Sequence, residues 1–333
     1  MKPRISAPHV AAYIETPTDV EIAVIIPVYL GEPLVGELVA RLHDTLQRIG
    51  GLYQIVLVDD RSPDNAWSLI KEEANKDPRV LGVRLSRNFG QHSAISAGIA
   101  HTKAGWYVVM DCDLQDPPEA IYDLHEAATQ RGHDIVIAER SSSGLGTGRN
   151  FGSRIFNSML RWTSGLDLSH KHGNFRIFSN RVAEAFRSFP ERLRLFPAIM
   201  SQVGFTASTI VVSRSERPNG RSSYNIFKLT RLALETIIAY SEKPLWIMAT
   251  IGSLVCALAF VYGLAMIAQV LVSGAAVPGF ATLVVLALFF GGLQLFLTSL
   301  VGLYVGRALD EAKSRPTFIV EDTTESSRME GGE

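Results

Sequence analysis

The chain contains 333 residues, of which 47% are hydrophobic, and it has a formal net charge of −1 at pH 7. This length can hold one large domain or two smaller ones with ample core, and the near-zero charge gives no support to a nucleic-acid-binding protein. The two cysteines, Cys112 and Cys256, lie in an acidic motif and in an apolar run. We therefore expect neither a disulfide framework nor a zinc site, which fits a reducing, cytosolic compartment.

The first part of the chain alternates apolar runs with helical patterns. Residues 1–20 are polar and lack the apolar core of a signal peptide, so we expect a flexible tail there. Short apolar runs predict strands, and amphipathic stretches predict helices. The expected strands are residues 22–29, 53–58, 80–85 and 106–110, and the expected helices are residues 34–49, a helix with Asp64 as N-cap, and residues 93–101. This order predicts an α/β domain with a doubly wound, mostly parallel sheet.

Polar residues follow the predicted strands at the point where each strand ends. In doubly wound sheets ligands bind beyond the carboxyl ends of the strands, so we expect these residues to converge on one rim. They are Asp59 and Asp60, Arg87 and Asn88, and Asp111 and Asp113. An acidic loop is usually only a solvated turn, but repeated placement at one edge argues against that interpretation.

The sequence around Asp111 and Asp113 carries the clearest chemical indication. The apolar run 106–110 stops at these carboxylates, and Pro117 and Pro118 prevent the strand from continuing. Two carboxylates at the end of a buried strand are costly unless something neutralises them. Their oxygens suit a hard cation such as Mg²⁺ or Mn²⁺, held together with substrate phosphates. The alternative is a polar turn, and the neighbouring rim residues favour the metal site.

The chain keeps its α/β character beyond this motif. We expect a fifth strand at residues 134–138, a mobile loop over the site at 141–148, an amphipathic helix at 149–162 and another strand at 203–212. His170 and His172 lack a third ligand nearby, so we predict a polar loop there rather than a metal site. We expect residues 213–223 to form a basic loop. The apolar face of residues 224–240 suits a helix in a membrane interface, although a core-packed helix has the same pattern.

Two apolar runs, residues 245–272 and 280–306, contain no charged residue. Each exceeds the roughly 20 residues needed to span a bilayer, so we expect a membrane protein rather than a buried helical hairpin. Lys243 precedes the first run, and Arg307, Lys313 and Arg315 follow the second, which predicts cytoplasmic flanks. Glycines in the second run permit close helix contact and a homo-oligomer. The acidic tail, residues 321–333, is expected to be disordered.

Four segments together resemble family 2 glycosyltransferases. They are residues 25–29 (IIPVY), 58–65 (VDDRSPDN), 87–92 (RNFGQH) and 111–119 (DCDLQDPPE). With the C-terminal hairpin, residues 20–310 are similar to the polyisoprenyl-phosphate glycosyltransferases, which include dolichol-phosphate mannose synthases, bactoprenol glucosyltransferases and undecaprenyl-phosphate aminoarabinose transferases. The resemblance implies a glycosyltransferase A-type domain, a nucleotide-sugar donor (UDP preferred), a polyisoprenyl phosphate acceptor, and a multi-pass bacterial inner-membrane protein with its catalytic domain and both termini cytoplasmic.

The resemblance also implies roles for individual residues. It assigns donor binding to Pro27, Tyr29, Glu32, Asp59, Asp60, Arg87 and Asp111. It assigns the metal to Asp111 and Asp113, and catalysis to these two with Gln115, Asp116 and Arg176. Contacts to the lipid phosphate are expected from Arg149, Arg221, Ser222 and Tyr224.

Two departures from the family pattern affect the expected mechanism. Many members have Asp, a proposed catalytic base, where this chain has Asn174, and many have Lys where it has Ser223. A lipid phosphate has a second pKa of about 6 and is largely a dianion at neutral pH, so it can attack without a base. Direct attack inverts the anomeric centre. Arg149, Arg176 and Arg221 are candidates to screen the repulsion between phosphates.

Two other functions stay open. One is a processive polysaccharide synthase, which usually carries Gln-x-x-Arg-Trp and more spans. Here Arg161-Trp162 lacks the glutamine, and two spans make a poor channel. The other is a non-catalytic membrane scaffold that only binds nucleotide-sugar, and the pair Asp111/Asp113 argues against it.

Overall fold

The computed structural model describes residues 20–140, 172–189, 194–213, 243–273 and 279–325. These residues fall into two compact units. The first contains residues 20–140, 172–189, 194–213 and 316–325, and the second contains 243–273 and 279–315. The expected loop 141–148, the expected helices 149–162 and 224–240, and all but the last residue of the N-terminal tail lie outside the described residues.

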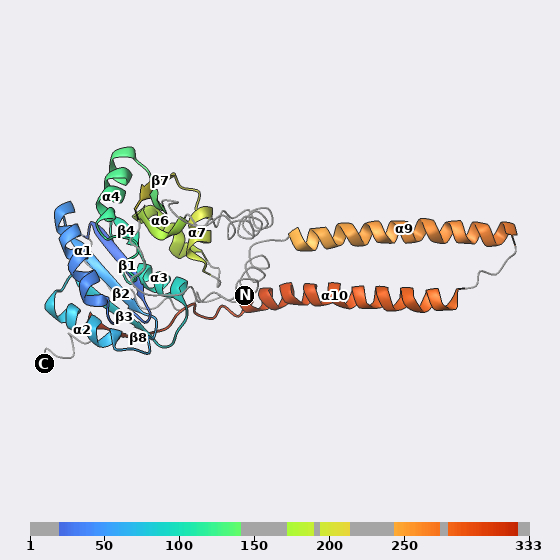
Figure 1. Ribbon diagram of the computed structural model, residues 1–333, viewed down its shortest axis with the longest axis horizontal. Helices are drawn as coiled ribbons and strands as arrows, with labels where there is room; N and C mark the ends of the chain where they lie inside the picture. The colour runs from blue at the N-terminus through green and yellow to red at the C-terminus, as the bar shows by residue number, and fades with distance from the viewer. Residues whose placement is uncertain (1–19, 141–171, 190–193, 214–242, 274–278, 326–333) are drawn as a thin grey trace, which may run out of the picture. The chain divides into compact units, whose positions relative to one another are not determined.

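The first unit is built on a single sheet with the strand order β7-β5-β6-β4-β1-β2-β3-β8 (Figure 1). The strands β1 (Ile22–Val28), β2 (Tyr53–Asp59), β3 (Val80–Leu85) and β4 (Trp106–Val109) are parallel to one another. Beyond β4, β6 (His172–Ser179) runs antiparallel between β4 and β5 (Ile135–Arg140), and β7 (Ala207–Val212) is parallel to β5. At the other edge, β8 (Val320–Thr323) is antiparallel to β3. The predicted mostly parallel sheet is confirmed.

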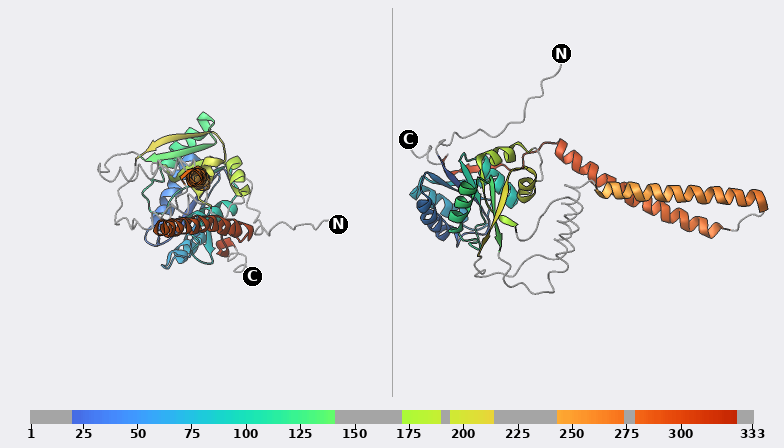
Figure 2. Two further views of the ribbon diagram at one scale, coloured as in Figure 1. Left: turned by 90° about the vertical axis from the view of Figure 1, so that its right-hand side faces the viewer. Right: turned by 90° about the horizontal axis from the view of Figure 1, so that it is seen from above.

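Helices cover both faces of this sheet (Figures 1 and 2). The helices α1 (Val35–Ile49), α2 (Ala66–Lys76) and α4 (Ala120–Arg131) pack on one face, and α3 (Gln91–Ala100), α6 (Asn180–Ser188) and α7 (Phe196–Gln202) on the other. Successive residues of β1 point alternately into the two hydrophobic cores on opposite faces of the sheet. Val24 and Ile26 belong to the core under α1, α2 and α4, and Ala23 and Ile25 belong to the core under α3, α6 and α7. Because β1 is buried on both faces, its sequence is a continuous apolar run.

The structure corrects the prediction of a polar loop around His172. Residues 172–179 form strand β6 in the interior of the sheet. Phe175 and Ile177 join the core under α1, α2 and α4, whereas Phe178 joins the opposite core. Arg176 lies on the same side of the strand as Phe178 and is also buried. Its charge interrupts the apolar alternation by which a strand is normally found in a sequence.

Three further boundaries differ from the sequence prediction. The helix α2 begins at Ala66 with Asn65 at the N-cap position, one residue after the predicted Asp64, although Asp64 Oδ1 accepts the Ala66 N–H at 3.2 Å. The strand β7 begins at Ala207 rather than at residue 203 and has alternately exposed positions, as an edge strand does. In the acidic tail, residues 320–323 form β8 and pair with β3. The expectation of disorder from Glu321 is therefore wrong for these residues.

The second unit contains the helices α9 (Lys243–Ser273) and α10 (Phe280–Ala312), coloured orange to red in Figure 2. Both are long and apolar enough to cross a membrane, by the windows Leu245–Tyr262 and Phe289–Ala312. Large apolar side chains are exposed along both helices, among them Trp246 and Leu295. Apolar surface of this kind is costly in water.

Candidate active site

The parallel strands bring the predicted polar residues to one rim. Because β1, β2, β3 and β4 are adjacent and parallel, their carboxyl ends meet at the same edge of the sheet. Tyr29 follows β1, Asp59 ends β2, Arg87 follows β3 and Asp111 follows β4. This arrangement confirms the expected rim. Tyr29 and Arg87 are exposed there, whereas Pro27 is buried within β1 in register with Val58.

The loops at this rim contain left-handed residues that are not glycine. Leu30 (φ 55°), Arg61 (φ 55°) and Leu114 (φ 53°) lie in the loops after β1, β2 and β4. This conformation costs a residue with a side chain about 1–2 kcal/mol, and such strain is concentrated at functional sites. Nothing in the local sequence pattern predicts it.

Three hydrogen bonds fasten the first two rim loops to each other. Ser62 Oγ accepts the Leu30 N–H at 2.7 Å. Asp64 Oδ2 accepts the Glu32 N–H, and Glu32 Oε2 accepts the Asn65 N–H, both at 3.0 Å. The carboxylate of Glu32, which the family resemblance assigns to donor binding, thus joins the loop after β1 to the loop after β2.

Asp59 and Asp60 are both buried and hold backbone groups. Asp59 Oδ1 accepts the Ser62 N–H at 2.9 Å. The Asp60 carboxylate accepts the N–H groups of Phe89 and Gly90 at 2.7 and 2.9 Å, which connects β2 to the loop after β3. Burial raises the pKa of both carboxyl groups. This positioning role was missed from the sequence, and direct contact of these carboxylates with a donor stays a prediction.

The predicted metal-binding residue Asp111 is held by two amide side chains. Its Oδ1 accepts a short hydrogen bond from Gln91 Nε2 and a second, at 3.2 Å, from Asn174 Nδ2. Gln91 is the first residue of α3, and Asn174 lies in β6, so three separate elements meet at this carboxylate. Asp113 Oδ1 accepts the Gln115 N–H at 3.2 Å. Gln91 lies in the quoted motif 87–92, but only the fold shows that it reaches Asp111.

Arg176 is a buried cation beside this corner. It is 3% exposed and lies opposite Val109 of β4, two residues before Asp111. Its Nη2 donates to Gly173 O at 2.7 Å, and its guanidinium lies 5.1 Å from the Phe196 ring centroid. Its Nε has no hydrogen-bond partner among the described residues. Burial lowers the pKa of Arg176 to about 10, so the group is still charged at neutral pH. Burial, with the nearby charge of Arg176, lowers the pKa of His92 to about 4, and this imidazole is neutral.

The remaining predicted residues lie either in the loops after β3 and β4 or outside the described residues. Gln115 and Asp116 are 3% and 5% exposed, just after the left-handed Leu114. The Arg87 guanidinium lies 4.0 Å from the Phe89 ring centroid, at a cavity of about 410 Å³ lined by residues 87–93, Arg194, Leu195, Pro316 and Thr317. Arg149, Arg221, Ser222 and Tyr224 lie outside the described residues.

The carboxylate pair fits a divalent cation that is bound together with a substrate. Within the described ranges no group of three His, Cys, Asp or Glu side chains is arranged to hold a metal ion. Mg²⁺ and Mn²⁺ are commonly bound by one or two carboxylates, with the other positions filled by phosphate oxygens and water. Cys112, between the two aspartates, is a poor ligand for such a cation, and burial raises the pKa of its thiol to about 11.

Comparison with known proteins defines the class of this protein. Residues 23–187, from β1 to α6, match the sequence profile described as Glycosyl transferase family 2. The chain belongs to this family, is a glycosyltransferase, and has the glycosyltransferase A-type fold.

Three relatives match this chain along nearly their whole length. The chain is 33% identical to an uncharacterized glycosyltransferase of Synechocystis, over 91% of this chain and 95% of the relative. It is 32% identical to an undecaprenyl-phosphate 4-deoxy-4-formamido-L-arabinose transferase of Edwardsiella ictaluri, over 92% and 95%. It is also 34% identical to a prophage bactoprenol glucosyl transferase homolog of Escherichia coli, over 90% and 98%.

Proposed function

We propose that this glycosyltransferase transfers one sugar, with inversion, from a nucleotide-sugar to a polyisoprenyl phosphate such as undecaprenyl phosphate. The observation that carries the proposal is that Asp111 and Asp113 directly follow β4, while a buried cation, Arg176, lies on the neighbouring strand β6 in register with Val109. Such a corner suits a reaction between two phosphate-bearing substrates. The names of the relatives support a lipid phosphate acceptor, and UDP is the preferred nucleotide by resemblance.

Asp111 and Asp113 would hold Mg²⁺ or Mn²⁺ against the donor diphosphate. When bound, such a cation supplies Lewis-acid stabilisation of the charge that develops on the departing diphosphate. Gln91 and Asn174 fix the orientation of the Asp111 carboxylate by donating to it. This preorganisation avoids rearrangement during the reaction.

The acceptor needs attraction and orientation rather than deprotonation. Asn174 is an amide that donates to Asp111, so it does not act as a base. A phosphate monoester is already largely a dianion at neutral pH, because its second pKa is about 6. Arg176 keeps its charge in this pH range and attracts the incoming phosphate. The neutral His92 beside it adds no competing charge.

The topology of the sheet supports a membrane hairpin. Strand β7 precedes α9, and β8 follows α10, and both strands belong to the same sheet. If the chain crosses a membrane between them, it therefore does so an even number of times. Two apolar helices meet this condition, and the basic flanks at Lys243, Arg307, Lys313 and Arg315 favour a cytoplasmic catalytic unit.

Transfer of label to a lipid tests the proposal. Purified full-length protein would be incubated with undecaprenyl phosphate and a panel of radiolabelled UDP- and GDP-sugars, with Mg²⁺ or Mn²⁺. We expect one donor to give a singly glycosylated lipid, and we expect both chelator and Asp113→Ala to abolish it. Polymeric product would instead favour a processive synthase. Transfer that persists in Asp113→Ala would contradict the role of the carboxylate pair.

A further inference from the structure

The segment after α10 is part of the sheet that carries the candidate site. Residues Val83 and Arg84 of β3 pair with Thr323 and Asp322 of β8. The Ser86 N–H donates to Ile319 O at 2.9 Å, and the Gly82 N–H donates to Thr324 Oγ1 at 3.0 Å. These bonds cover the edge of β3, which would otherwise be open.

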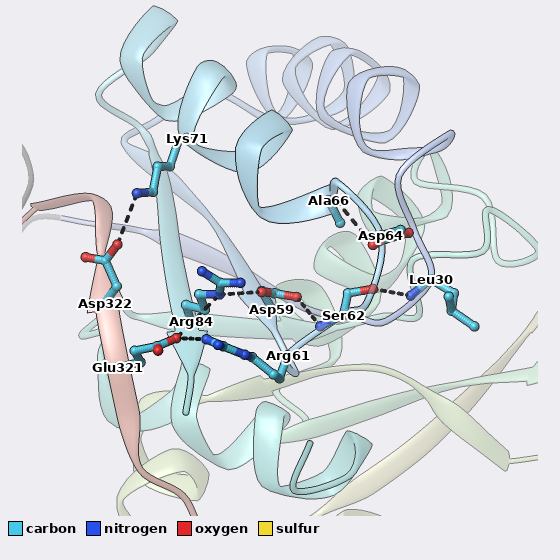
Figure 3. A network of polar contacts seen from close by, with 10 residues as sticks. All are labelled: Leu30, Asp59, Arg61, Ser62, Asp64, Ala66, Lys71, Arg84, Glu321 and Asp322. Atoms are coloured by element: carbon cyan, nitrogen blue, oxygen red, sulfur yellow. Dashed lines mark hydrogen bonds and ion pairs between the residues drawn. The ribbon is translucent and has the colours of Figure 1, made fainter. Parts of the chain in front are cut away.

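Glu321 of this segment completes a row of alternating charges that leads to the rim (Figure 3). Its Oε2 forms an ion pair with Arg61 Nη1 and lies 3.6 Å from Arg84 Nε. Arg84 Nε in turn lies 3.2 Å from Asp59 Oδ2. Asp59 is fully buried, whereas Glu321 and Arg61 are each 40% exposed at their side chains. The order along this row is Arg61, Glu321, Arg84 and Asp59.

Both ends of the row flank the start of the loop that connects β2 to α2, because Asp59 is the last residue of β2 and Arg61 lies in the loop. Asp59 Oδ1 accepts the Ser62 N–H, and Ser62 Oγ accepts the N–H of Leu30, the residue after Tyr29. Arg61 lies between Asp59 and Ser62 in a left-handed conformation. The loop is thus fixed from inside by Asp59 and from outside by Glu321. An ion pair to a strained residue is a means of keeping that residue in its conformation.

We propose that Glu321 is a positioning residue for the nucleotide of the donor. Its carboxylate bridges Arg61 and Arg84, offsets the repulsion between these two cations, and thereby fixes the loop 59–64 beside Tyr29. This inference rests on the proposed function, because it takes the loops after β1 and β2 as the donor-binding side of the rim. It also gives β8, which follows α10 in the chain, a role in donor binding by the sheet-containing unit to which it belongs.

Asp322 provides a matched control on the same strand. Its Oδ2 lies 3.2 Å from Lys71 Nζ on α2, so this ion pair fastens β8 to a helix rather than to the rim loops. Glu321→Gln and Asp322→Asn each remove one negative charge from β8 and keep the side-chain shape. A general loss of β8 docking would affect both variants alike.

The experiment measures nucleotide affinity and transfer kinetics of the full-length protein in detergent. UDP and GDP, each with Mg²⁺, are titrated calorimetrically into the wild type, Glu321→Gln and Asp322→Asn, and thermal unfolding is recorded for each protein. We expect Glu321→Gln to weaken nucleotide binding and raise the KM for the donor by about two- to fivefold, the upper part of the range for a partly exposed charged contact. The KM for undecaprenyl phosphate should not change. Asp322→Asn should stay within about twofold of the wild type in both donor measurements.

The outcomes separate this inference from the proposed function. If the wild type binds neither nucleotide, both are wrong. If the wild type binds a nucleotide but the two variants behave alike, only the role of Glu321 is overturned. The same conclusion follows if Glu321→Gln lowers the unfolding temperature but leaves the KM for the donor unchanged, because that result describes a structural contact alone.

Discussion

Arg176 lies on β6 in register with Val109 of β4, and Asp111 follows β4, but the described residues provide no carboxylate partner for Arg176. A buried and unpaired charge lowers stability, because its desolvation is not compensated. Its retention in the interior of the sheet is explained if an anionic substrate supplies the missing partner. We therefore expect the charge of Arg176 to lower the stability of the protein but to be needed for its activity.

Replacement of Arg176 by methionine tests both expectations, the effect on stability and the effect on activity. We expect Arg176→Met to leave the unfolding temperature unchanged or raised, because a desolvated charge is removed. Sugar transfer should fall by at least about a hundredfold, as when an electrostatic contact to the reacting groups is lost. Arg181→Met, at a side chain that is 75% exposed on α6, is the control and should retain activity. A variant that is strongly destabilised yet still active would contradict the assigned role.

His92 makes stability depend on pH in a defined direction. The pKa of His92 is about 4 in the folded protein and about 6.5 in an unfolded chain. Between these values the unfolded state binds more protons, so the stability is fully present above pH 6.5 and is lost as the pH falls toward 4. At pH 5 this loss is about 2 kcal/mol.

The variant His92→Gln should flatten this pH dependence. Thermal unfolding of the wild type and the variant at pH 7.5 and pH 5 measures the effect. We expect the unfolding temperature of the wild type to fall more steeply between these two values than that of the variant. Equal decreases would show that His92 is not held neutral by its surroundings.

At the scale of elements, α3 connects the core to the site. Its small residues allow close approach to β1, and its first residue, Gln91, donates to Asp111. A Cβ on Gly98 would lie 2.4 Å from Ile25 Cγ2 and 3.2 Å from Val58 Cγ2. The helix would have to move away from the sheet to accommodate it, and Gln91 would move with it.

The variant Gly98→Ala should therefore reduce both stability and activity. Overpacking of this kind costs about 1–3 kcal/mol, which thermal unfolding can detect. Transfer at a temperature where the variant is folded should also fall, because Asp111 loses its hydrogen-bonded support. The control is Gly36→Ala in α1, where a Cβ meets nothing within 4 Å. That change should be neutral or stabilising by up to about 1 kcal/mol.

At the scale of the whole molecule, β7 and β8 belong to one sheet although α9 and α10 lie between them in the chain, so in the proposed topology the chain returns to the side of the membrane from which it left. A protein that crosses the membrane through α9 and α10 meets this requirement with a single hairpin. Oligomer formation through the glycines of α10 stays a prediction. Outside their own helix backbone and adjacent residues, a Cβ added at Gly291 or Gly302 would meet no described atom within 4 Å.

Reporter fusions test this topology. We expect green fluorescent protein fused after residue 333 to fluoresce, because both flanks of the hairpin are cytoplasmic in the proposal. Alkaline phosphatase should be active when fused after residue 276, between the two helices, and inactive when fused after residue 333. Active phosphatase at the C-terminus would contradict the hairpin, because β8 could not then reach a cytoplasmic sheet.

The candidate site was predictable where its residues follow buried strands. Asp59 and Asp111 mark the ends of apolar runs, and parallel pairing brings such ends to one edge. Gln91 and Glu321 were not assigned to Asp111 and Arg61, because those contacts depend on how α3 and β8 pack. The Arg61–Glu321 ion pair joins residues 260 positions apart in the chain.

Local sequence was sufficient to predict the strands β1 to β4, the apolar helices α9 and α10, and the position of the carboxylates. A strand buried on both faces requires a continuous apolar run, and a membrane-spanning helix requires a longer one, so both are visible in local composition. The places of β6 and β8, by contrast, became clear only from the folded chain. Their sequences are polar or interrupted by a charge, and their backbone groups find hydrogen-bond partners on strands far away in the chain. Pairing of this kind satisfies backbone groups whatever the side chains are, so local sequence leaves no trace of it.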